Sequence, residues 1–305
     1  MNELLLSSLT PPLNLIAGNY SNMAPSPTAR SGEVIALFEG GIYVWGGSYG
    51  ALNNTMERYD IASNTWSSVA PANSAPTPRH NPGHCFLDGK LYIFGGSTGV
   101  NWGPMTNEAW SYDFATKIWT KLANYPVSLA LVSAAAVNGK IYLFGGFTGT
   151  GASSPFHEYD PVANTYRTIT HSQYARYGQR AVGYGGKFYV FGGSIGSSTV
   201  LDTLSYDPSN NTWATLKQNS YGRPHAYLSI IDHLVYVYAG RQGNEAGPIN
   251  KLMRYNIQTG NWTELPAGGV PNYMGACVAT QNAIYAVGGY DLPSGQSSTN
   301  LVKIT

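Results

Sequence analysis

The sequence predicts an all-β fold built from six copies of one unit, and two observations carry this prediction. The first is a strand-like stretch, Leu91–Gly96, that returns with a period of roughly fifty residues. Counted at the first glycine position, the copies stand at 46, 95, 145, 192, 239 and 288. The second is a tyrosine followed seven residues later by another aromatic residue, which occurs after each of the first five copies.

The recurring stretch is short and rich in β-branched and aromatic residues, which is typical of a strand. Five of the six copies end in a glycine pair, and in the remaining copy Ala239 replaces the first glycine. Glycine accepts a positive φ and lets a second backbone approach closely. A pair that recurs at one period therefore indicates a repeated strand rather than chance composition.

The aromatic spacing predicts a hairpin in each unit, because turn residues such as Asp160-Pro161 and Asn164 lie between the two aromatics. We expect one aromatic on each strand of this hairpin, buried in the core between neighbouring units. The pairs are Tyr59 with Trp66, Tyr112 with Trp119, Tyr159 with Tyr166, Tyr206 with Trp213 and Tyr255 with Trp262.

A glycine pair followed by Tyr and Trp at this spacing resembles the Kelch repeat, and the resemblance covers nearly the whole chain. It implies a six-bladed Kelch β-propeller, all-β, with four antiparallel strands in each blade. The departures are Ala239 and Tyr166, which replace a glycine and a tryptophan. The repeats run end to end without a linker, so we expect residues 1–305 to form a single domain. No BTB or BACK sequence accompanies the repeats in these 305 residues.

The last repeat stops early, and the start of the chain is expected to complete it. After Gly289, residues 300–305 supply a third strand. Residues 19–25 align with residues 65–71, which places Tyr20 where Trp66 stands. We therefore predict that residues 16–24 form the closing outer strand of the sixth blade. Such closure would leave no open sheet edge in the ring.

Each repeat begins with a strand rich in small residues, such as 133–137, which suits crowding near the axis of a ring. A hairpin turn leads to the glycine-pair strand, and a loop of variable length follows. Variable loops on a rigid scaffold often carry function. Cys85 and Cys277, the only cysteines, fall in the small-residue strands and are predicted to be buried free thiols.

Arginines recur where the chain enters the first strand of a unit, sixteen residues before the first glycine position. We call these six residues the start positions: Arg30, Arg79, Leu129, Arg176, Arg223 and Asn272. Since the first two strands are antiparallel, the start positions share one face with the variable loops, and Arg241 joins them. The acids expected on the same loops are only Asp202, Glu245 and Asp291. The sequence therefore predicts a positively biased face around the central opening.

Converging arginines suit carboxylate or phosphate groups, and in Kelch proteins that bind acidic peptides the same positions form the pocket. The resemblance thus implies a binding module for an acidic peptide or protein, or an anionic small molecule. The predicted ligand-binding residues are Arg30, Arg79, Arg176, Arg223, Arg241, His80, Tyr177, Asn272, Tyr273 and Tyr290. Trp102 and Tyr49 are further candidates for stacking. The alternative for each arginine is that it ties neighbouring loops together by donating to backbone carbonyls.

An enzyme is the second hypothesis, because six-bladed Kelch proteins include a sialic-acid mutarotase that handles an anionic sugar. Another sugar- or small-acid-processing enzyme would use the same pocket. His80, His225, Glu33 and Arg180 are available near the arginines for acid–base chemistry, but the sequence assigns no catalytic residue. A purely structural propeller is the third hypothesis.

The remaining expectations concern partners, cofactors and compartment. The net charge is +1 and only 11% of residues are charged, so nothing global favours nucleic acid or a membrane surface. No histidine or cysteine spacing indicates a metal, no cofactor is expected, and we expect a monomer. Residues 1–8 carry Glu3 and no basic segment, which makes a poor signal peptide. The compartment stays unknown, with the cytoplasm slightly favoured and an exported mature chain possible.

Overall fold

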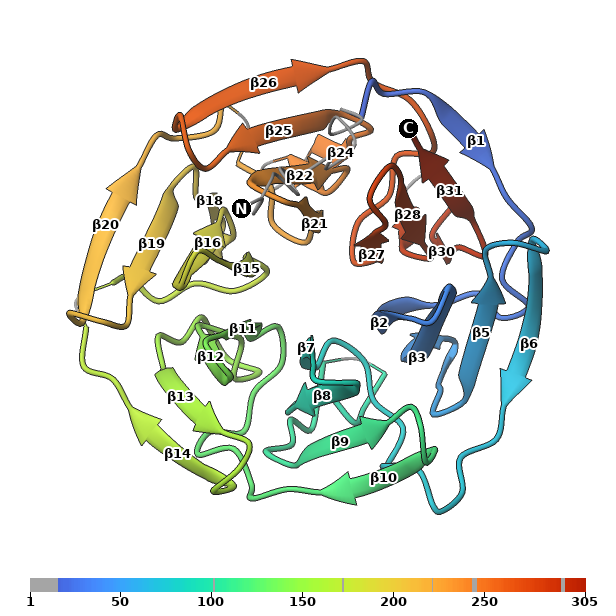
Figure 1. The fold of residues 1–305 in the computed structure, drawn as a ribbon, viewed down its shortest axis with the longest axis horizontal. Coiled ribbons are helices and arrows are strands. Elements are labelled where there is room, and N and C mark those ends of the chain that lie inside the picture. The colour runs from blue at the N-terminus through green and yellow to red at the C-terminus, as the bar shows by residue number, and fades with distance from the viewer. Residues whose placement is uncertain (1–15, 101, 172, 221, 243–245, 292–293) are drawn as a thin grey trace, which may run out of the picture.

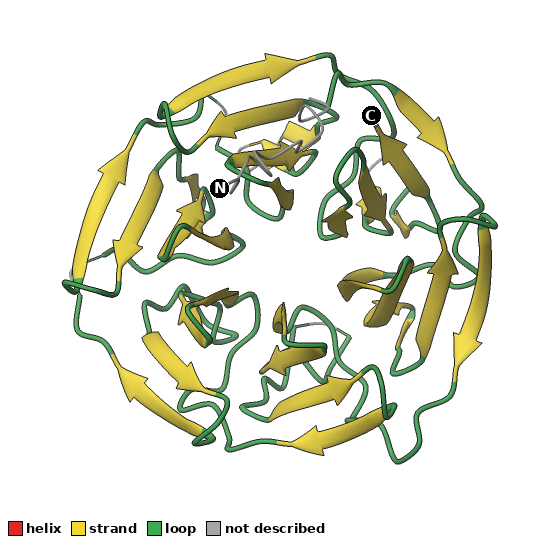
Figure 2. Ribbon diagram, viewed as in Figure 1, coloured by secondary structure: helices red, strands yellow, loops and turns green. Residues whose placement is uncertain are grey.

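The computed structural model describes residues 16–305 except 101, 172, 221, 243–245 and 292–293. This described part consists of strands and loops without a helix (Figure 2). The strands form six blades around a central opening (Figure 1). Each blade has four antiparallel strands, arranged in order from the axis to the rim. The predicted all-β, six-bladed propeller is confirmed.

The first three blades follow the chain from the axis outward. Blade 1 contains β2 (Ser31–Phe38), β3 (Gly41–Tyr49), β5 (Met56–Asp60) and β6 (Thr65–Val69), with β4 (Ala51–Leu52) paired to the end of β3. Blade 2 contains β7 (Gly83–Leu87), β8 (Lys90–Phe94), β9 (Ala109–Asp113) and β10 (Ile118–Lys121). Blade 3 contains β11 (Ser133–Val137), β12 (Lys140–Phe144), β13 (Phe156–Asp160) and β14 (Thr165–Thr168).

The other three blades repeat this order. Blade 4 contains β15 (Arg180–Tyr184), β16 (Lys187–Phe191), β19 (Thr203–Asp207) and β20 (Thr212–Leu216). Blade 5 contains β21 (Tyr227–Ile231), β22 (Leu234–Tyr238), β25 (Leu252–Asn256) and β26 (Asn261–Leu265). Blade 6 contains β27 (Ala276–Ala279), β28 (Ile284–Val287), β31 (Leu301–Ile304) and β1 (Tyr20–Asn22). Short ribbons extend three of the variable loops: β17 (Ser194–Ile195) with β18 (Ser198–Thr199), β23 (Arg241–Gln242) with β24 (Ala246–Pro248), and β29 (Tyr290–Asp291) with β30 (Gln296–Ser297).

The ring is closed by pairing the two ends of the chain, as the sequence predicts. Strand β1 pairs antiparallel with β31, and Tyr20 lies opposite Ile304. In Figure 1, β1 (blue) lies beside β31 (dark red) at the rim. The amides of Gly18 and Asn19 also donate to the carbonyl of Thr305, at 2.9 and 2.8 Å. The sixth blade therefore has its fourth strand from the other end of the sequence.

The glycine pairs form joints between neighbouring blades. Gly46 and Gly47 have φ values of 73° and 85°, and a Cβ on Gly46 would lie 3.0 Å from the carbonyl oxygen of Arg79 in the next blade. The Gly47 amide donates to that same carbonyl at 3.0 Å. The second residue of four other pairs does the same to the next start position: Gly96 to Leu129, Gly146 to Arg176, Gly240 to Asn272 and Gly289 to Arg30. Close backbone approach thus explains why glycine recurs here.

The hydrophobic core lies between blades rather than in one centre. Six clusters of buried residues each combine side chains from two neighbouring blades. The five predicted aromatic pairs lie opposite each other on their hairpins, with ring centroids 4.8–5.3 Å apart. The tyrosine at the first position of each pair is buried. At the second position Trp119 is buried, whereas Trp66, Trp213 and Trp262 are half-buried.

The half-buried outer aromatics also bond to the preceding blade. The indole of Trp66 donates to Ala24 O at 2.8 Å, and the hydroxyl of Tyr166 donates to Ala123 O at 3.0 Å. Trp262 donates to Lys217 O at 3.0 Å and Tyr20 to Pro266 O at 2.8 Å. These carbonyls follow the outer strand of the neighbouring blade, so an aromatic with a polar tip suits both the core and the rim.

The cysteines lie on the innermost strands, as predicted. Cys277 is buried, Cys85 is half-buried, and both are free thiols. Burial raises the pKa of the Cys277 thiol to about 12 and raises the pKa of the Cys85 thiol further. Both thiols are therefore protonated at neutral pH and unreactive as nucleophiles.

Deletion of residues 1–24 should destabilise the whole ring, because it removes β1 and exposes the edge of β31. We expect the melting temperature to fall by about 10 °C or more, at roughly 2 °C for each kcal/mol in a chain of this size. Scanning calorimetry with light scattering measures this. A synthetic peptide of residues 16–24 should restore part of the loss. A truncated protein that melts like the full chain would show that closure does not stabilise the fold.

Candidate functional site

The start positions and the variable loops lie on one face of the ring. The residue after each start position pairs with the residue after a glycine pair, which is the arrangement that antiparallel pairing predicts. The pairs are Ser31 with Ser48, His80 with Ser97, Ala130 with Phe147, Tyr177 with Ser194 and Tyr273 with Tyr290. In the fifth blade the Arg241 amide donates to Pro224 O at 3.1 Å. We call this side of the ring the loop face.

The arginines at the start positions are held inside the wall of the ring. Arg30, Arg79 and Arg176 are completely buried, and Arg223 is 3% exposed. A guanidinium Nη1 of each donates to a backbone carbonyl of its own blade, to Gly46 O (3.1 Å), Gly95 O (3.2 Å), Gly192 O (3.4 Å) and, for Arg223, Val237 O (3.2 Å) and Lys251 O (2.8 Å). Asn272 replaces arginine in the same role, because its amide donates to Gly288 O at 3.2 Å. These contacts match the loop-tying alternative.

Three of these arginines also pair with carboxylates at the start of the third strand of their blades. The ion pairs are Arg30 with Glu57 at 2.9 Å, Arg79 with Glu108 at 2.7 Å and Arg176 with Asp202 at 3.5 Å. The expectation that few acids accompany the arginines is therefore wrong. Sequence reasoning missed Glu57 and Glu108 because they lie outside the loops. Their signal is an acid two to four residues before the repeated tyrosine, which also places Asp202.

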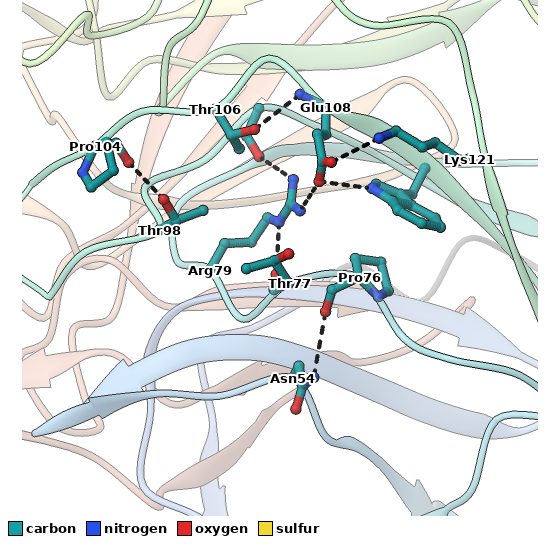
Figure 3. A network of polar contacts seen from close by, with 11 residues as sticks. Asn54, Pro76, Thr77, Arg79, Thr98, Pro104, Thr106, Glu108 and Lys121 are labelled. Atoms are coloured by element: carbon teal, nitrogen blue, oxygen red, sulfur yellow. Dashed lines mark hydrogen bonds and ion pairs between the residues drawn. The ribbon is translucent and has the colours of Figure 1, made fainter.

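The network around Arg79 shows how completely such a guanidinium is satisfied (Figure 3). Its Nε donates to Thr77 O at 3.0 Å and its Nη2 contacts the Glu108 carboxylate. Lys121 and Trp110 donate to the same carboxylate at 2.9 and 3.2 Å. Burial alone would raise the pKa of Glu108, but the hydrogen bonds from Lys121, Arg79 and Trp110 outweigh it and lower the pKa to about 2. The positive charge of Arg79 is thus neutralised within the blade.

The opening on the loop face is surrounded mainly by aromatic rings. Successive ring centroids lie 5.2–6.2 Å apart from the second blade to the sixth. We call this set the aromatic arc, and it runs in the order His80, Trp102, Phe147, Tyr177, His225, Tyr273 and Tyr290. Between blades 6 and 1 polar contacts replace the rings. There the Tyr49 hydroxyl donates to Gln296 Oε1 at 2.7 Å, and the Ser297 hydroxyl donates to Ser48 O at 2.9 Å.

The arc combines partly exposed rings with one cationic side chain beside them. Trp102, Phe147, Tyr177 and Tyr290 are each partly exposed. The guanidinium of Arg241 lies 5.9 Å from the ring centroid of Tyr273, within the range of a cation–π contact. Burial, with the nearby charges of Arg180 and Arg241, lowers the pKa of His225 to about 3. Of the ten predicted ligand-binding residues, the arc and its cation include His80, Tyr177, Tyr273, Tyr290 and Arg241.

A belt of backbone hydrogen bonds lies next to the arc, two residues after each start position. All six residues there have positive φ: Gly32, Asn81, Leu131, Gly178, His225 and Met274. Five of the six amides donate to the equivalent carbonyl of the preceding blade: Gly32 to Met274, Asn81 to Gly32, Leu131 to Asn81, His225 to Gly178 and Met274 to His225, at 2.6–3.0 Å. The left-handed backbone is costly for residues other than glycine. The belt therefore fixes the position of the backbone that carries or adjoins several residues of the arc.

Glu33 lies one residue beyond the belt and is buried. The equivalent residue in blade 4, Gln179, donates its side-chain amide to Phe144 O at 2.7 Å. The carboxylate oxygens of Glu33 make no hydrogen bond of good geometry, although the backbone amides of Glu33 and Ala276 lie near them. Burial raises the pKa of Glu33 to about 8, although the backbone amides of Glu33 and Ala276 and the charges of Arg30 and Arg180 oppose the shift. Glu33 is therefore mostly a neutral acid at pH 7.

The described residues hold no group of three His, Cys, Asp or Glu side chains that could bind a metal ion. Of the residues considered for acid–base chemistry, His80, His225 and Glu33 are buried, and Arg180 lines a cavity along the axis of the ring. Burial also lowers the pKa of His80, whose Nε2 lies 3.1 Å from Gly99 O. Within the part that the structure describes, no helix is long and apolar enough to cross a bilayer.

Comparisons with known proteins agree with this architecture. A family model described as the KLHDC2/KLHL20/DRC7 Kelch-repeats domain matches residues 19–175 and 123–289. The chain is 30% identical over 133 residues to Kelch-like protein terF of Aspergillus terreus, covering 43% of this chain and 28% of terF. It is 31% identical over 108 residues to human Kelch domain-containing protein 10, covering 33% of this chain and 23% of that protein. The chain thus spans less than a third of the length of either relative.

Replacement of Arg79 by Gln should lower the free energy of unfolding by about 3 kcal/mol, because it breaks a buried ion pair and the bond to Gly95 O. Lys121→Gln is the matched control, since Lys121 contacts the same carboxylate from a side chain that is 51% exposed. It should cost less than about 1 kcal/mol. Urea denaturation of both variants measures the difference. Equal costs would contradict a structural role for the Arg79 pair.

Glu33→Gln should remove a pH dependence of stability. The pKa of Glu33 is raised on folding, so its contribution is intact below pH 4.5 and is lost as the pH rises towards 8. The charged groups that bear on it are Arg30 and Arg180. The wild type should therefore lose up to about 1.4 kcal/mol of stability per pH unit relative to the variant in this window. Glu39→Gln, at an exposed turn, is the control. Parallel pH profiles for the wild type and Glu33→Gln would refute a neutral Glu33.

Proposed function

This chain belongs to the Kelch-repeat family, and on that premise we propose that it binds a protein segment bearing carboxylates at the loop face around the central opening. Kelch propellers generally bind proteins, and this proposal rests on that general role. The proposed partner presents an exposed acidic peptide or loop and is not a nucleic acid or a membrane.

The aromatic arc is the observation that carries the proposal. Large flat rings such as Trp102 and Phe147 provide contact area with little loss of side-chain entropy, and tyrosine adds a hydroxyl for hydrogen bonding. Aromatic residues are enriched in the cores of protein interfaces for this reason. The arc lies on a rigid belt of backbone hydrogen bonds, so the surface is preorganised and binding does not have to order it.

The preference for carboxylates is supported by the charge at the arc. Arg241 is partly exposed above Tyr273, and the pKa of His225 is lowered first by burial and then by the nearby charges of Arg180 and Arg241. The buried start-position residues support the site from within the wall: Arg30, Arg79, Arg176, Arg223 and Asn272. Direct contacts are therefore proposed for Arg241, Tyr177, Tyr290 and the neighbouring arc residues.

A display library of short random peptides tests this proposal. Peptides selected on the protein should be enriched in Asp or Glu together with apolar residues. Tyr177→Ala should weaken a selected peptide at least about tenfold, since truncating an interface aromatic commonly costs more than about 1.4 kcal/mol. Arg241→Gln should reduce the enrichment in acids and the salt dependence of binding.

Phe86→Ala is the matched control, because Phe86 is 39% exposed at the end of β7, away from the loop face. It should leave peptide affinity unchanged. Selected peptides without acidic enrichment, or affinity that depends on Phe86 and not on Tyr177, would overturn the proposal. The alternative is an enzyme that acts on an anionic sugar or a small acid. Acceleration of sialic-acid anomer exchange, followed by nuclear magnetic resonance and abolished by Tyr177→Ala, would replace the binding module with this alternative.

A further inference from the structure

The six innermost strands enclose a cavity of about 450 Å³ along the axis. Its walls come from β2, β7, β11, β15, β21 and β27 and the residues just before them. This volume falls within the range of roughly 300–1,000 Å³ that small-molecule sites occupy. We infer that this cavity, which we call the channel, is a second binding site for a small monocarboxylate held by Arg180. The inference goes beyond the proposed function, which concerns the loop face.

Arg180 extends along the channel wall past two other blades. It stands at the start of β15, and its Nε donates to Ala226 O in blade 5 at 2.7 Å. Its Nη2 lies 3.4 Å from Gly275 O in blade 6. The equivalent positions of the other blades carry Val34, Gly83, Ser133, Tyr227 and Ala276. Blade 4 alone therefore places a cation at this level of the channel.

Among the residues that the structure describes, Arg180 has no ion-pair partner. Arg30, Arg79 and Arg176 each pair with a carboxylate at 3.5 Å or less. By contrast, among the described residues no carboxylate lies within 4.0 Å of Arg180. Arg180 is partly exposed and lines a channel whose walls are largely apolar, where a charge gains more from an ion partner than it does in bulk water. An anion from solution can supply that partner.

The other titratable groups near Arg180 do not supply negative charge. Glu33 is unpaired and buried, and its pKa of about 8 keeps it mostly neutral at pH 7. His84 lines the channel, and burial with the charge of Arg180 lowers its pKa to about 4. The thiol of Cys277 is protonated because burial raises its pKa to about 12. The group near the axis thus carries one net positive charge, which matches one carboxylate.

The side chains that line the rest of the channel indicate the chemistry of the part of the ligand beyond its carboxylate. The lining is mostly small and apolar, including Ala36, Ala135, Ala136, Val182 and Ala279. Such a wall favours an aliphatic chain and disfavours a sugar or a second charge, whose polar groups would lose hydrogen bonds to water. Arg180 offers a planar pair of donors that suits a carboxylate. A short aliphatic monocarboxylate combines both properties.

Isothermal titration calorimetry with sodium hexanoate tests the inference on the full chain. Hexanoate should bind with one site, and hexanamide, which has the same shape without the charge, should bind at least about tenfold more weakly. Arg180→Gln should weaken hexanoate by a similar factor, whereas Arg167→Gln on the rim should not. Arg241→Gln should leave hexanoate binding intact, so failure here and failure at the loop face are distinguishable.

Arg180→Gln also loses two contacts to the wall, so a second variant keeps the test independent of folding. Ala136→Leu fills part of the channel without touching Arg180 and should weaken hexanoate, while its circular dichroism spectrum stays that of the wild type. Inorganic phosphate is the competing probe and should bind more weakly than hexanoate. Absence of hexanoate binding, tighter binding of phosphate, or affinity unchanged by both Arg180→Gln and Ala136→Leu would each overturn the inference.

Discussion

The structure depends on the joint between one blade and the next at the glycine pairs. In the joint the second glycine donates its amide to the carbonyl of the next start position, as Gly47 does to Arg79 at 3.0 Å. The guanidinium of Arg79 in turn donates to Gly95 in its own blade at 3.2 Å. The start-position residue therefore connects two successive joints, one through its backbone carbonyl and the other through its side chain. Glycine suits the joint because a Cβ at the first position would crowd the carbonyl of the next start position, as at Gly46 and Arg79, and Ala239 is the one residue with a side chain at this position.

This chain of contacts changes the meaning of the recurring arginines. A residue type that occurs at the same position of most blades makes contacts that also recur in most blades, namely contacts within its own blade and with the next one. Glu57, Glu108 and Asp202 complete the pattern by neutralising three of the four guanidiniums. The loop face thus takes its chemistry from residues that differ between blades. The residues directly after the second glycine positions show this difference, because they are Phe147, Arg241 and Tyr290 in three blades and Ser48, Ser97 and Ser194 in the others.

Features that depend on the period of the repeats can be predicted from the sequence. Contacts that depend on the direction of individual side chains are much harder to predict. The number of repeats and the closing strand at Tyr20 follow from spacing and alignment, the resemblance to the Kelch repeat implies four-stranded blades, and the structure confirms all three. The loop face was also predictable, because it needs only antiparallel pairing. The direction of the Arg30 side chain was not, since it depends on Glu57, twenty-seven residues later and on a different strand. The aromatic arc likewise joins rings from five blades whose contacts no local pattern encodes.

Equivalent positions in this ring differ in how their charges are held. Four arginines occupy one repeated position, where each donates to a backbone carbonyl and three also pair with carboxylates. Arg180 occupies a position where no other blade has a cation, and no described carboxylate pairs with it. Near it stands Glu33, which is also unlike most of its equivalents and is buried without a hydrogen bond of good geometry. A repeat protein can keep such groups only where the repeated contacts already hold the fold, because each of them costs stability. The unpaired groups therefore lie at the axis, enclosed by the belt of backbone bonds that all six blades share.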